Sequence, residues 1–146
     1  PPGENVAISR VPGLVETNDL AATFLDYAGV EIPPQMAAQS LRPIIEGTGE
    51  TRDSIFSEYL INDQSQKSKC VRTDRYKFIF TDKNRPSEFY DLQEDPNEQH
   101  NLYNDPAYAK EIDRHKDLML DTLMHSEQFY YKDETPSGRD LQIWLD

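Results

Sequence analysis

The chain has 146 residues, enough for one domain that buries roughly two thirds of its unfolded surface, or for one domain plus a flanking piece of another. Its net charge of −12 argues against nucleic acid and anionic membranes as partners, and no apolar run approaches the ~18 residues of a membrane span. The single cysteine, Cys70, excludes an internal disulfide framework.

A first helix is predicted over residues 19–28, after an extended lead-in that shows no clear period. Asn18 or Thr17 can supply the N-cap, and Gly29 occupies the position after the C-terminus where glycine is favoured. An apolar stripe runs along this helix on Leu20, Phe24 and Ala28, with Leu25 beside them. A stripe of this kind needs a packing partner.

A second helical turn is predicted over residues 40–47, where Gly47 ends it. The sequence Gly-Thr-Gly-Glu-Thr over residues 47–51 then forms a flexible break. We place a domain boundary after residue 50, because beyond the break the apolar period changes from helical to extended.

Four strands are predicted after the break, over residues 54–59, 69–73, 76–81 and 88–92. The second and third strands form a hairpin that turns at Asp74-Arg75. In the third strand, alternation places three aromatic side chains on one face of the sheet. These are Tyr76, Phe78 and Phe80.

A long helix is predicted from Pro106 to about His125, with Asp105 as its cap. Its buried stripe is expected on Tyr108, Ile112, Met119 and Leu123. Residues 126–146 form an aromatic tail that we expect to pack on another surface. Four antiparallel strands and one long amphipathic helix make a two-layer α+β unit over residues 51–125, whose second sheet face is open to water or to a partner.

Basic residues are concentrated between positions 67 and 85, in contrast to the acidic remainder of the chain. This segment carries a net charge of +5 and the rest carries −17. One interpretation is the solvated outer face of strands, and the other is a surface that faces an anionic substrate. The basic residues are Lys67, Lys69, Arg72, Arg75, Lys77, Lys83 and Arg85.

The acidic stretch EFYDLQEDPNEQHNL, residues 88–102, has the composition of a calcium loop. Its oxygen-bearing side chains alternate, but Pro96 stands where an EF-hand loop needs glycine. The Asp-Pro-Asn-Glu sequence instead predicts a turn in which the Asp95 carboxylate accepts backbone N–H groups. Asn101 is then expected to bond to the local backbone before Leu102 enters the core.

Neither Cys70 nor the helical histidines predict a catalytic or metal site. Cys70 has basic neighbours, but a small buried thiol in a strand is the commoner case. His115 with Glu111 and His125 with Asp121 are i, i+4 pairs, which a solvated helix face explains better than a metal. By its sites alone, the sequence contains no recognisable catalytic centre.

Four motifs follow one another in order within residues 19–125. DLAATFLDYAG (19–29) is similar to Asp-Leu-x-Pro-Thr-x-Leu-x-x-x-Gly, and SLRPIIEG (40–47) is similar to the later part of Gly-x-Ser-Leu-x-Pro-x-x-x-Gly. VRTDRYK (71–77) contains Arg-Thr-x-x-Tyr-Lys, and residues 88–102 match Glu-Leu-Tyr-Asp-Leu-x-x-Asp-Pro-x-Glu-x-x-Asn-Leu almost throughout. The set resembles the C-terminal part of sulfatases, which belong to the alkaline-phosphatase-like superfamily.

The resemblance implies a parent enzyme that hydrolyses sulfate esters, with a formylglycine nucleophile and calcium in a larger N-terminal α/β catalytic domain. The family's Cys/Ser-x-Pro-x-Arg motif is not present around Cys70, so no catalytic residue or metal ligand carries over to this chain. Residues 1–50 would be the last helical pieces of the catalytic domain. Residues 51–125 would be the subdomain that packs on it and helps to wall the substrate cleft. Departures from the motifs, none of which touches chemistry, stand at Ala22, Ala38 and Asp74.

Arg72, Arg75 and Lys77 are the candidates for contact with the substrate, a sulfated small molecule or glycan, because guanidinium suits a sulfate oxyanion. Two alternatives are a related phosphatase or phosphodiesterase and a free-standing interaction module. In a free-standing module the stripe of residues 19–28 would lack a local partner. A sulfatase fragment is instead expected to expose apolar surface and to associate with itself.

The compartment follows only from the family, whose members are expected to be periplasmic or secreted. The sequence starts at Pro1 without methionine or a signal-like apolar stretch, which indicates a trimmed chain and gives no direct evidence on localisation. The upstream coding sequence is therefore the observation expected to separate a fragment from a module in its own right.

Overall fold

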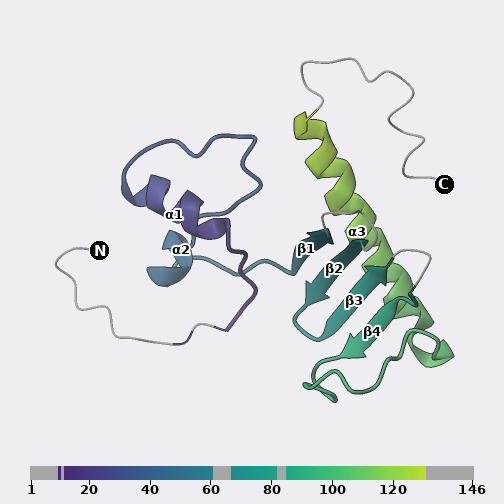
Figure 1. Ribbon diagram of the computed structural model, residues 1–146. Helices are drawn as coiled ribbons and strands as arrows, with labels where there is room; N and C mark the ends of the chain where they lie inside the picture. Colours follow the sequence, from purple (N-terminus) through teal and green to yellow (C-terminus); the bar gives the residue numbers. More distant parts are fainter. Residues whose placement is uncertain (1–9, 11, 61–66, 82–84, 131–146) are drawn as a thin grey trace.

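Four strands form one antiparallel sheet in the computed structural model, which describes residues 10, 12–60, 67–81 and 85–130. Their order is β1-β2-β3-β4, so each strand lies beside the next one in sequence (Figure 1). The predicted antiparallel sheet is confirmed, and Arg72 pairs with Lys77 across the predicted hairpin. The strands are β1 (Ser54–Leu60), β2 (Lys67–Thr73), β3 (Tyr76–Thr81) and β4 (Glu88–Asp91).

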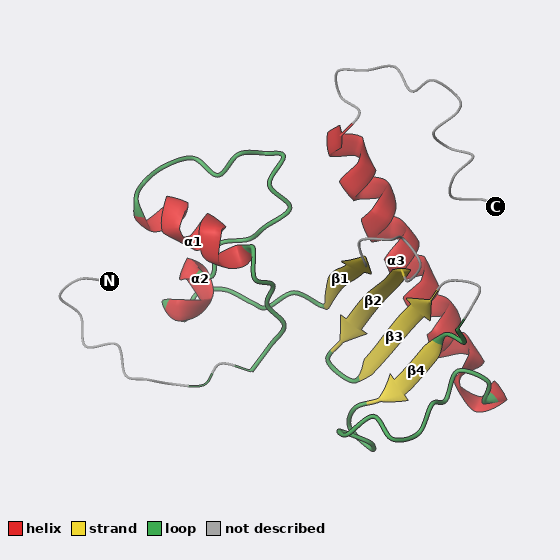
Figure 2. Ribbon diagram, viewed as in Figure 1, coloured by secondary structure: helices red, strands yellow, loops and turns green. Residues whose placement is uncertain are grey.

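One long helix, α3 (Ala109–Tyr130), lies across one face of the sheet and makes the second layer (Figure 2). A 3-10 turn, η1 (Pro106–Tyr108), precedes it, and the Asp105 carboxylate accepts the N–H of Ala107 at 2.9 Å, as a cap should. The predicted α+β architecture is therefore confirmed. The core between the two layers consists of Val71, Phe78, Phe89, Ile112 and Met119.

The side chains predicted to form apolar faces are buried at the centre of each face and more exposed toward its ends. Of the stripe predicted for the long helix, Ile112 and Met119 on α3 are buried, whereas Leu123 on α3 and Tyr108, which lies in η1, are half-buried. On β3, Phe78 is buried and Phe80 is about half exposed. The core is thus concentrated where the first half of α3 crosses the sheet.

The N-terminal half of the chain contains α1 (Asp19–Tyr27) and α2 (Arg42–Ile45), which stand beside the sheet in Figure 1. Gly29 adopts a φ of 69°, so its predicted role after the end of α1 is confirmed. Asn18 occupies the N-cap position of α1, as predicted, but its side chain makes no capping hydrogen bond and donates instead to the carbonyl of Ala37 at 2.8 Å.

The predicted apolar stripe of α1 is not buried within this chain. Leu20 is 51% exposed and Phe24 is 70% exposed, while Ala22 and Thr23 form the buried side of the helix. Among the described residues, nothing in the sheet or α3 covers this stripe, as expected for a fragment and not for a free-standing module.

Part of the C-terminal prediction lies outside the described residues. α3 continues to Tyr130, and the aromatic tail predicted beyond it, over residues 131–146, is not described. The side chain of His125 also lies outside the description. Within the described part of the chain, no helix combines the length and apolar character needed to cross a membrane.

Candidate functional site

Two of the three predicted substrate residues lie on the face of the sheet that α3 leaves open. Arg72 on β2 and Lys77 on β3 are direct cross-strand partners. Their strand neighbours Val71 and Phe78 are buried under α3. Because side chains alternate between the two faces of a strand, Arg72 and Lys77 point away from the helix. The third candidate, Arg75, lies in the turn that joins the two strands.

The Lys77 ammonium is already paired with a carboxylate. Its Nζ lies 2.7 Å from Oε2 of Glu98. Glu98 has a φ of 55°, the only left-handed value at a non-glycine residue in the described ranges, and its N–H donates to the carbonyl of Asp95 at 3.1 Å. Few non-glycine residues adopt this conformation. The ion pair therefore holds the loop after β4 against the sheet.

Arg75 is likewise engaged, by a buried carboxylate. Its Nε lies 3.1 Å from both oxygens of Asp91, and its Nη2 lies 2.7 Å from Oδ2. This guanidinium, helped by the N–H groups of Glu94 and Gln93, keeps the pKa of Asp91 below its usual range even though burial acts to raise it. The guanidinium also lies 5.0 Å above the ring of Tyr76. Arg75 thus fastens the hairpin turn to the end of β4.

Arg72 differs from the other two candidates because its charge has no partner in the described part of the chain. Its side chain is exposed, and its guanidinium makes no hydrogen bond or ion pair with any described residue. It can therefore present two parallel N–H donors to an anion that approaches the open face.

Cys70 lies on the same open face, two residues before Arg72. Its side chain is half-buried, and burial raises the pKa of the thiol above its usual value, against the opposing effects of Lys77 and of a hydrogen bond with Ser57. The thiol is therefore protonated near neutral pH, which fits the predicted inert strand cysteine and not a nucleophile.

The acidic stretch after β4 forms the predicted turn. Oδ2 of Asp95 accepts the N–H of His100 at 2.8 Å, and Oδ1 of Asn101 accepts the N–H of Phe89 at 3.1 Å. Leu102 then packs against the core, as expected. No group of three or more His, Cys, Asp or Glu side chains in the described ranges could hold a metal ion. The stretch is a turn that fastens the edge of β4.

His115 contradicts the prediction of a solvated helix face, because it is 0% exposed. Its Nδ1 lies 2.7 Å from the carbonyl of Glu111, so it donates there and leaves Nε2 to accept from the hydroxyl of Thr73 at 3.1 Å. The rings of Tyr76 and Phe89 meet the imidazole edge to face. Burial lowers the pKa of His115, and the ring is part of the core in its neutral form.

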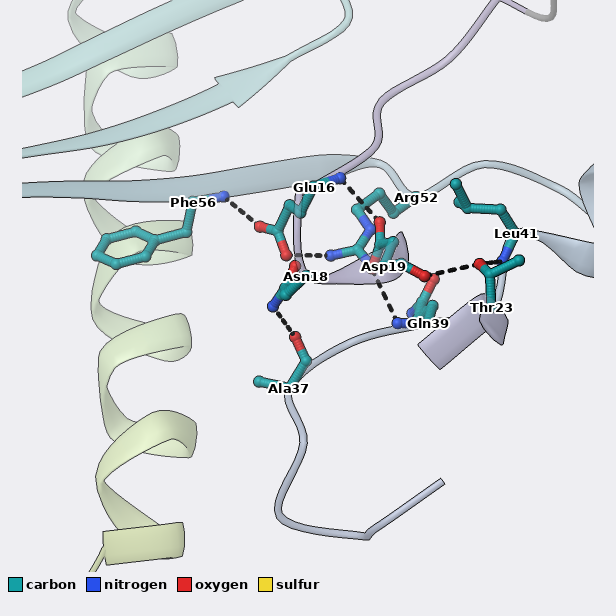
Figure 3. Close-up of polar contacts among 9 residues, drawn as sticks. All are labelled: Glu16, Asn18, Asp19, Thr23, Ala37, Gln39, Leu41, Arg52 and Phe56. Atoms are coloured by element: carbon teal, nitrogen blue, oxygen red, sulfur yellow. Dashed lines mark hydrogen bonds and ion pairs between the residues drawn. The ribbon is translucent and has the colours of Figure 1, made fainter. Parts of the chain in front are cut away.

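A buried polar cluster, not predicted from the sequence, joins α1 to the start of β1 (Figure 3). We call Glu16, Asp19 and Arg52 the Asp19 cluster. The Asp19 side chain is 0% exposed and accepts from Arg52 Nη2 at 2.5 Å and from the N–H groups of Glu16 and Gln39 at 2.8 and 2.9 Å. Glu16 pairs with Arg52 Nη1 at 2.6 Å and accepts the N–H of Phe56 on β1 at 2.9 Å.

Further polar contacts extend the cluster to the segment before α2. The hydroxyl of Thr23 donates to the carbonyl of Asp19 at 2.6 Å and accepts the N–H of Leu41 at 2.8 Å (Figure 3). Leu14 also forms a β-bridge with Arg52. The lead-in, α1, the following loop and the linker to β1 are therefore fixed to one another by polar bonds. One guanidinium serves both carboxylates, and every buried side-chain nitrogen and oxygen of the cluster has a hydrogen-bond partner, so the cluster serves to position these segments.

The comparisons with known proteins agree on one family. The family model described as "N-sulphoglucosamine sulphohydrolase, C-terminal" matches residues 2–125. An N-acetylglucosamine-6-O-sulfatase of Bacteroides thetaiotaomicron is 34% identical over 134 residues, which cover 86% of this chain and 23% of that protein. The chain spans about a quarter of the length of the curated relatives that it matches first.

Two solved structures share the fold at recognisable identity. A 2-O GAG sulfatase superposes with a TM-score of 0.69 at 31% identity, over 77% of this chain and 25% of that chain. A phosphonate monoester hydrolase from Silicibacter pomeroyi superposes with a TM-score of 0.69 at 27% identity, over 80% of this chain and 26% of that chain. The same scaffold therefore occurs in enzymes named for two kinds of ester.

Proposed function

This chain belongs to the family of N-sulphoglucosamine sulphohydrolase C-terminal domains, and from that membership we propose that it is the C-terminal part of an enzyme that hydrolyses sulfate esters. The observation that carries the proposal is the match over residues 2–125, together with relatives that are sulfatases and about four times longer. The chain itself supports the enzyme by packing on the upstream catalytic domain and is inactive alone.

The calcium ion and formylglycine expected of a sulfatase belong to the upstream part of the enzyme. The described residues of this chain do not fit either group, because no cluster of carboxylates, histidines or cysteines could hold a metal. Arg72 stands where the formylglycine motif after Cys70 would need proline. No step of the reaction is therefore assigned to a residue of this chain.

The substrate proposed for the whole enzyme is a sulfated sugar. The names of the relatives support this, since they include N-acetylglucosamine-6-O-sulfatase and Delta 4,5-hexuronate-2-O-sulfatase. Of the three candidates for substrate contact, Arg72 is supported best, because Arg75 and Lys77 are already paired with Asp91 and Glu98. We place Arg72 on the wall of the substrate cleft, where it binds an anionic group of the substrate.

A second candidate function is hydrolysis of a phosphonate or phosphate ester. The specific observation in its favour is the superposition on the phosphonate monoester hydrolase, which equals that on the 2-O GAG sulfatase in TM-score. The two candidates differ in residues outside this chain, because the nucleophile of either enzyme lies upstream.

The test of the function begins with the coding sequence upstream of Pro1. We expect an open frame of several hundred residues that contains Cys/Ser-x-Pro-x-Arg. The full-length protein should then release sulfate from 4-nitrophenyl sulfate or from a sulfated disaccharide. A frame without that motif, together with hydrolysis of a phosphonate monoester and no hydrolysis of the sulfate esters, would establish the second candidate instead.

The role of Arg72 is tested in the same full-length enzyme. Arg72→Gln should raise KM for the sulfated sugar by about tenfold, the loss expected for one charge-assisted contact, and leave kcat nearly unchanged. Arg85→Gln is the matched control, since Arg85 is also exposed and belongs to the same basic segment. Equal kinetic constants for the Arg72 variant and the control would contradict the proposal that Arg72 lines the substrate cleft.

A further inference from the structure

A surface pocket lies between the segment that precedes η1 and the first turns of α3. Figure 1 shows this part of the molecule on the side of the sheet away from α1 and α2. The pocket has a volume of about 260 Å³, slightly below the range of pockets that enclose drug-sized ligands, so it suits a small unit such as one sugar ring. We call it the Tyr103 pocket, and its lining includes Tyr103, Asn104, Asp105, Ile112, Asp113 and Lys116.

The apolar part of the Tyr103 pocket is fixed by the core. Ile112 is 4% exposed and belongs to the core between the sheet and α3. The ring of Tyr103 stacks on that of Phe78, with the centroids 6.1 Å apart and the planes 15° from parallel. This stacking holds the Tyr103 ring in one orientation. A ligand ring can therefore pack on a preformed surface, which lowers the cost of ordering the site.

Polar groups line the rest of the pocket, and several of them have no partner among the described residues. Neither the Asn104 amide nor the Tyr103 hydroxyl forms a hydrogen bond with the described part of the chain. Asp105 uses one oxygen to cap η1, and Asp113 uses one to pair with Lys116 at 3.0 Å, so each carboxylate retains a second oxygen. The ammonium of Lys116 has three donors, of which this pair uses one. The pocket thus offers donors and acceptors side by side.

Charge determines the kind of ligand that the Tyr103 pocket can take. Its two carboxylates, Asp105 and Asp113, outnumber the single ammonium of Lys116, and the whole chain is acidic as well. A carboxylate also occupies the position before η1 and α3 that would otherwise favour an anion. A sulfate or phosphate group is therefore disfavoured here. A neutral ligand with several hydroxyl groups fits instead, because it donates to the carboxylates, accepts from the ammonium and packs its C–H groups on the aromatic ring.

We propose that the Tyr103 pocket binds an unsulfated sugar residue of the glycan on which the whole enzyme acts, an inference that rests on the proposed function. The pocket lies on the α3 side of the sheet, whereas Arg72 lies on the opposite side, so the pocket is separate from the proposed cleft. A sugar that has lost its sulfate can bind here while another unit of the same glycan occupies the cleft. Attachment at two sites raises the effective concentration of the remaining sulfate esters.

The test is an NMR titration of the 146-residue chain with a desulfated glycosaminoglycan tetrasaccharide. The signals of the Asn104 side-chain amide and of the Lys116 backbone amide should shift on binding. The sulfated parent tetrasaccharide should bind at these signals at least about tenfold more weakly, because its anionic groups meet the carboxylates of the pocket.

Two pairs of variants assign the binding to the pocket. Asp113→Asn should weaken the affinity about threefold to tenfold, the loss expected for one hydrogen bond to a charged group. Asp117→Asn makes the same change at an exposed position of α3 outside the pocket and should leave the affinity unchanged. Asn104→Ala and its control Asn97→Ala, also at an exposed position outside the pocket, repeat the comparison with neutral side chains.

Each outcome either supports or overturns the proposal. Shifts at the pocket, with both pocket variants weaker than their controls, support it. Unshifted pocket signals, equal affinities of variants and controls, or tighter binding of the sulfated tetrasaccharide at these signals would overturn it. The readout involves no catalysis. Pocket binding by the chain, combined with a full-length protein that lacks sulfatase activity, would refute the proposed function alone, whereas sulfatase activity without pocket binding would refute the sugar site alone.

Discussion

Residues 12–50 and the unit of sheet and α3 differ in what holds each of them together. In the sheet and α3, the buried cluster is mainly apolar and includes Phe78 and Phe89, with Asp91 and His115 buried beside it. In the N-terminal part the arrangement is reversed, because Asp19 is the buried group and Phe24 is exposed.

The difference separates a unit that is stable by its own core from a segment that needs another surface. Burial of apolar area is the main source of folding free energy, and polar clusters add specificity at a net cost in desolvation. The sheet with α3 buries apolar area in a core of its own. The segment with α1 has its polar contacts complete but lacks the apolar burial, which we assign to the upstream domain.

The largest expected effect is the loss of Phe89. Phe89→Ala should lower the free energy of unfolding by about 3–5 kcal/mol, because it leaves a cavity between β4 and α3. Phe24→Ala is the matched control in the N-terminal part and should change it by less than about 0.5 kcal/mol in the 146-residue chain. Urea denaturation measures both, and equal losses would erase the distinction between the two regions.

The second effect concerns the Asp19 cluster. Arg52→Ala leaves the buried Asp19 carboxylate without its cation, which should cost about 3 kcal/mol of local stability. Hydrogen exchange should then speed up in α1 and not in β3. Arg42→Ala, which removes a half-exposed pair with Asp26 on the same helix, should cost less than about 1 kcal/mol. Faster exchange throughout the sheet would show that the cluster supports the core.

The third effect is a pH dependence at His115. Its pKa is lower in the folded chain than in the unfolded chain, so the unfolded state binds the extra proton first. Stability is thus complete above the unfolded pKa near 6.5 and falls as the pH drops toward the folded pKa, by at most about 1.4 kcal/mol per pH unit. Glu111 and Arg114 are the charged groups that act on the ring.

His115→Gln should abolish this slope between pH 7 and pH 5 in urea denaturation of the chain. The carboxylates, Asp91 among them, remain as the cause of destabilisation at lower pH. A slope that persists in the variant would assign the proton uptake to another group and return His115 to a purely packing role.

The smallest effect is expected at Arg72. Because its guanidinium contacts no described partner, Arg72→Gln should leave the urea midpoint within about 0.5 kcal/mol of the parent value. Lys77→Gln, measured beside it, should be the less stable of the two, since it leaves Glu98 unpaired against the sheet. The reverse order would mean that Arg72 has a structural partner.

Local signals in the sequence were sufficient for most of the fold. Alternation and turn residues predict β1 to β4 and the hairpin at residues 74–75, and Asp105-Pro106 predicts the start of the long helix. His115 could have been found as well, because it lies three residues after Ile112 and four before Met119, on the buried side of α3. Its burial was not predicted because histidine is polar, although a neutral imidazole with two hydrogen-bond partners is readily buried.

The partners of the charged residues could not be predicted in this way. Arg52 and Asp19 are 33 positions apart, and Lys77 and Glu98 are 21 apart, so only the folded chain brings them together. A single sequence shows which residues are charged and not which carboxylate each cation meets. For this reason the basic segment suggested three substrate residues, of which two have carboxylate partners in the fold.

The Glu16 side chain has a further consequence at the edge of the sheet. Phe56, Val71, Phe78 and Phe89 form one row across the four strands. At one end of the row the Glu16 carboxylate accepts a hydrogen bond from the N–H of Phe56, and at the other end Oδ1 of Asn101 accepts one from the N–H of Phe89. Unpaired N–H groups on edge strands can pair with strands of other chains, so these two side chains disfavour aggregation by occupying such N–H groups. A shorter chain that begins after Glu16 would keep the core of the sheet and α3 but would leave the N–H of Phe56 without this acceptor at the edge of the sheet.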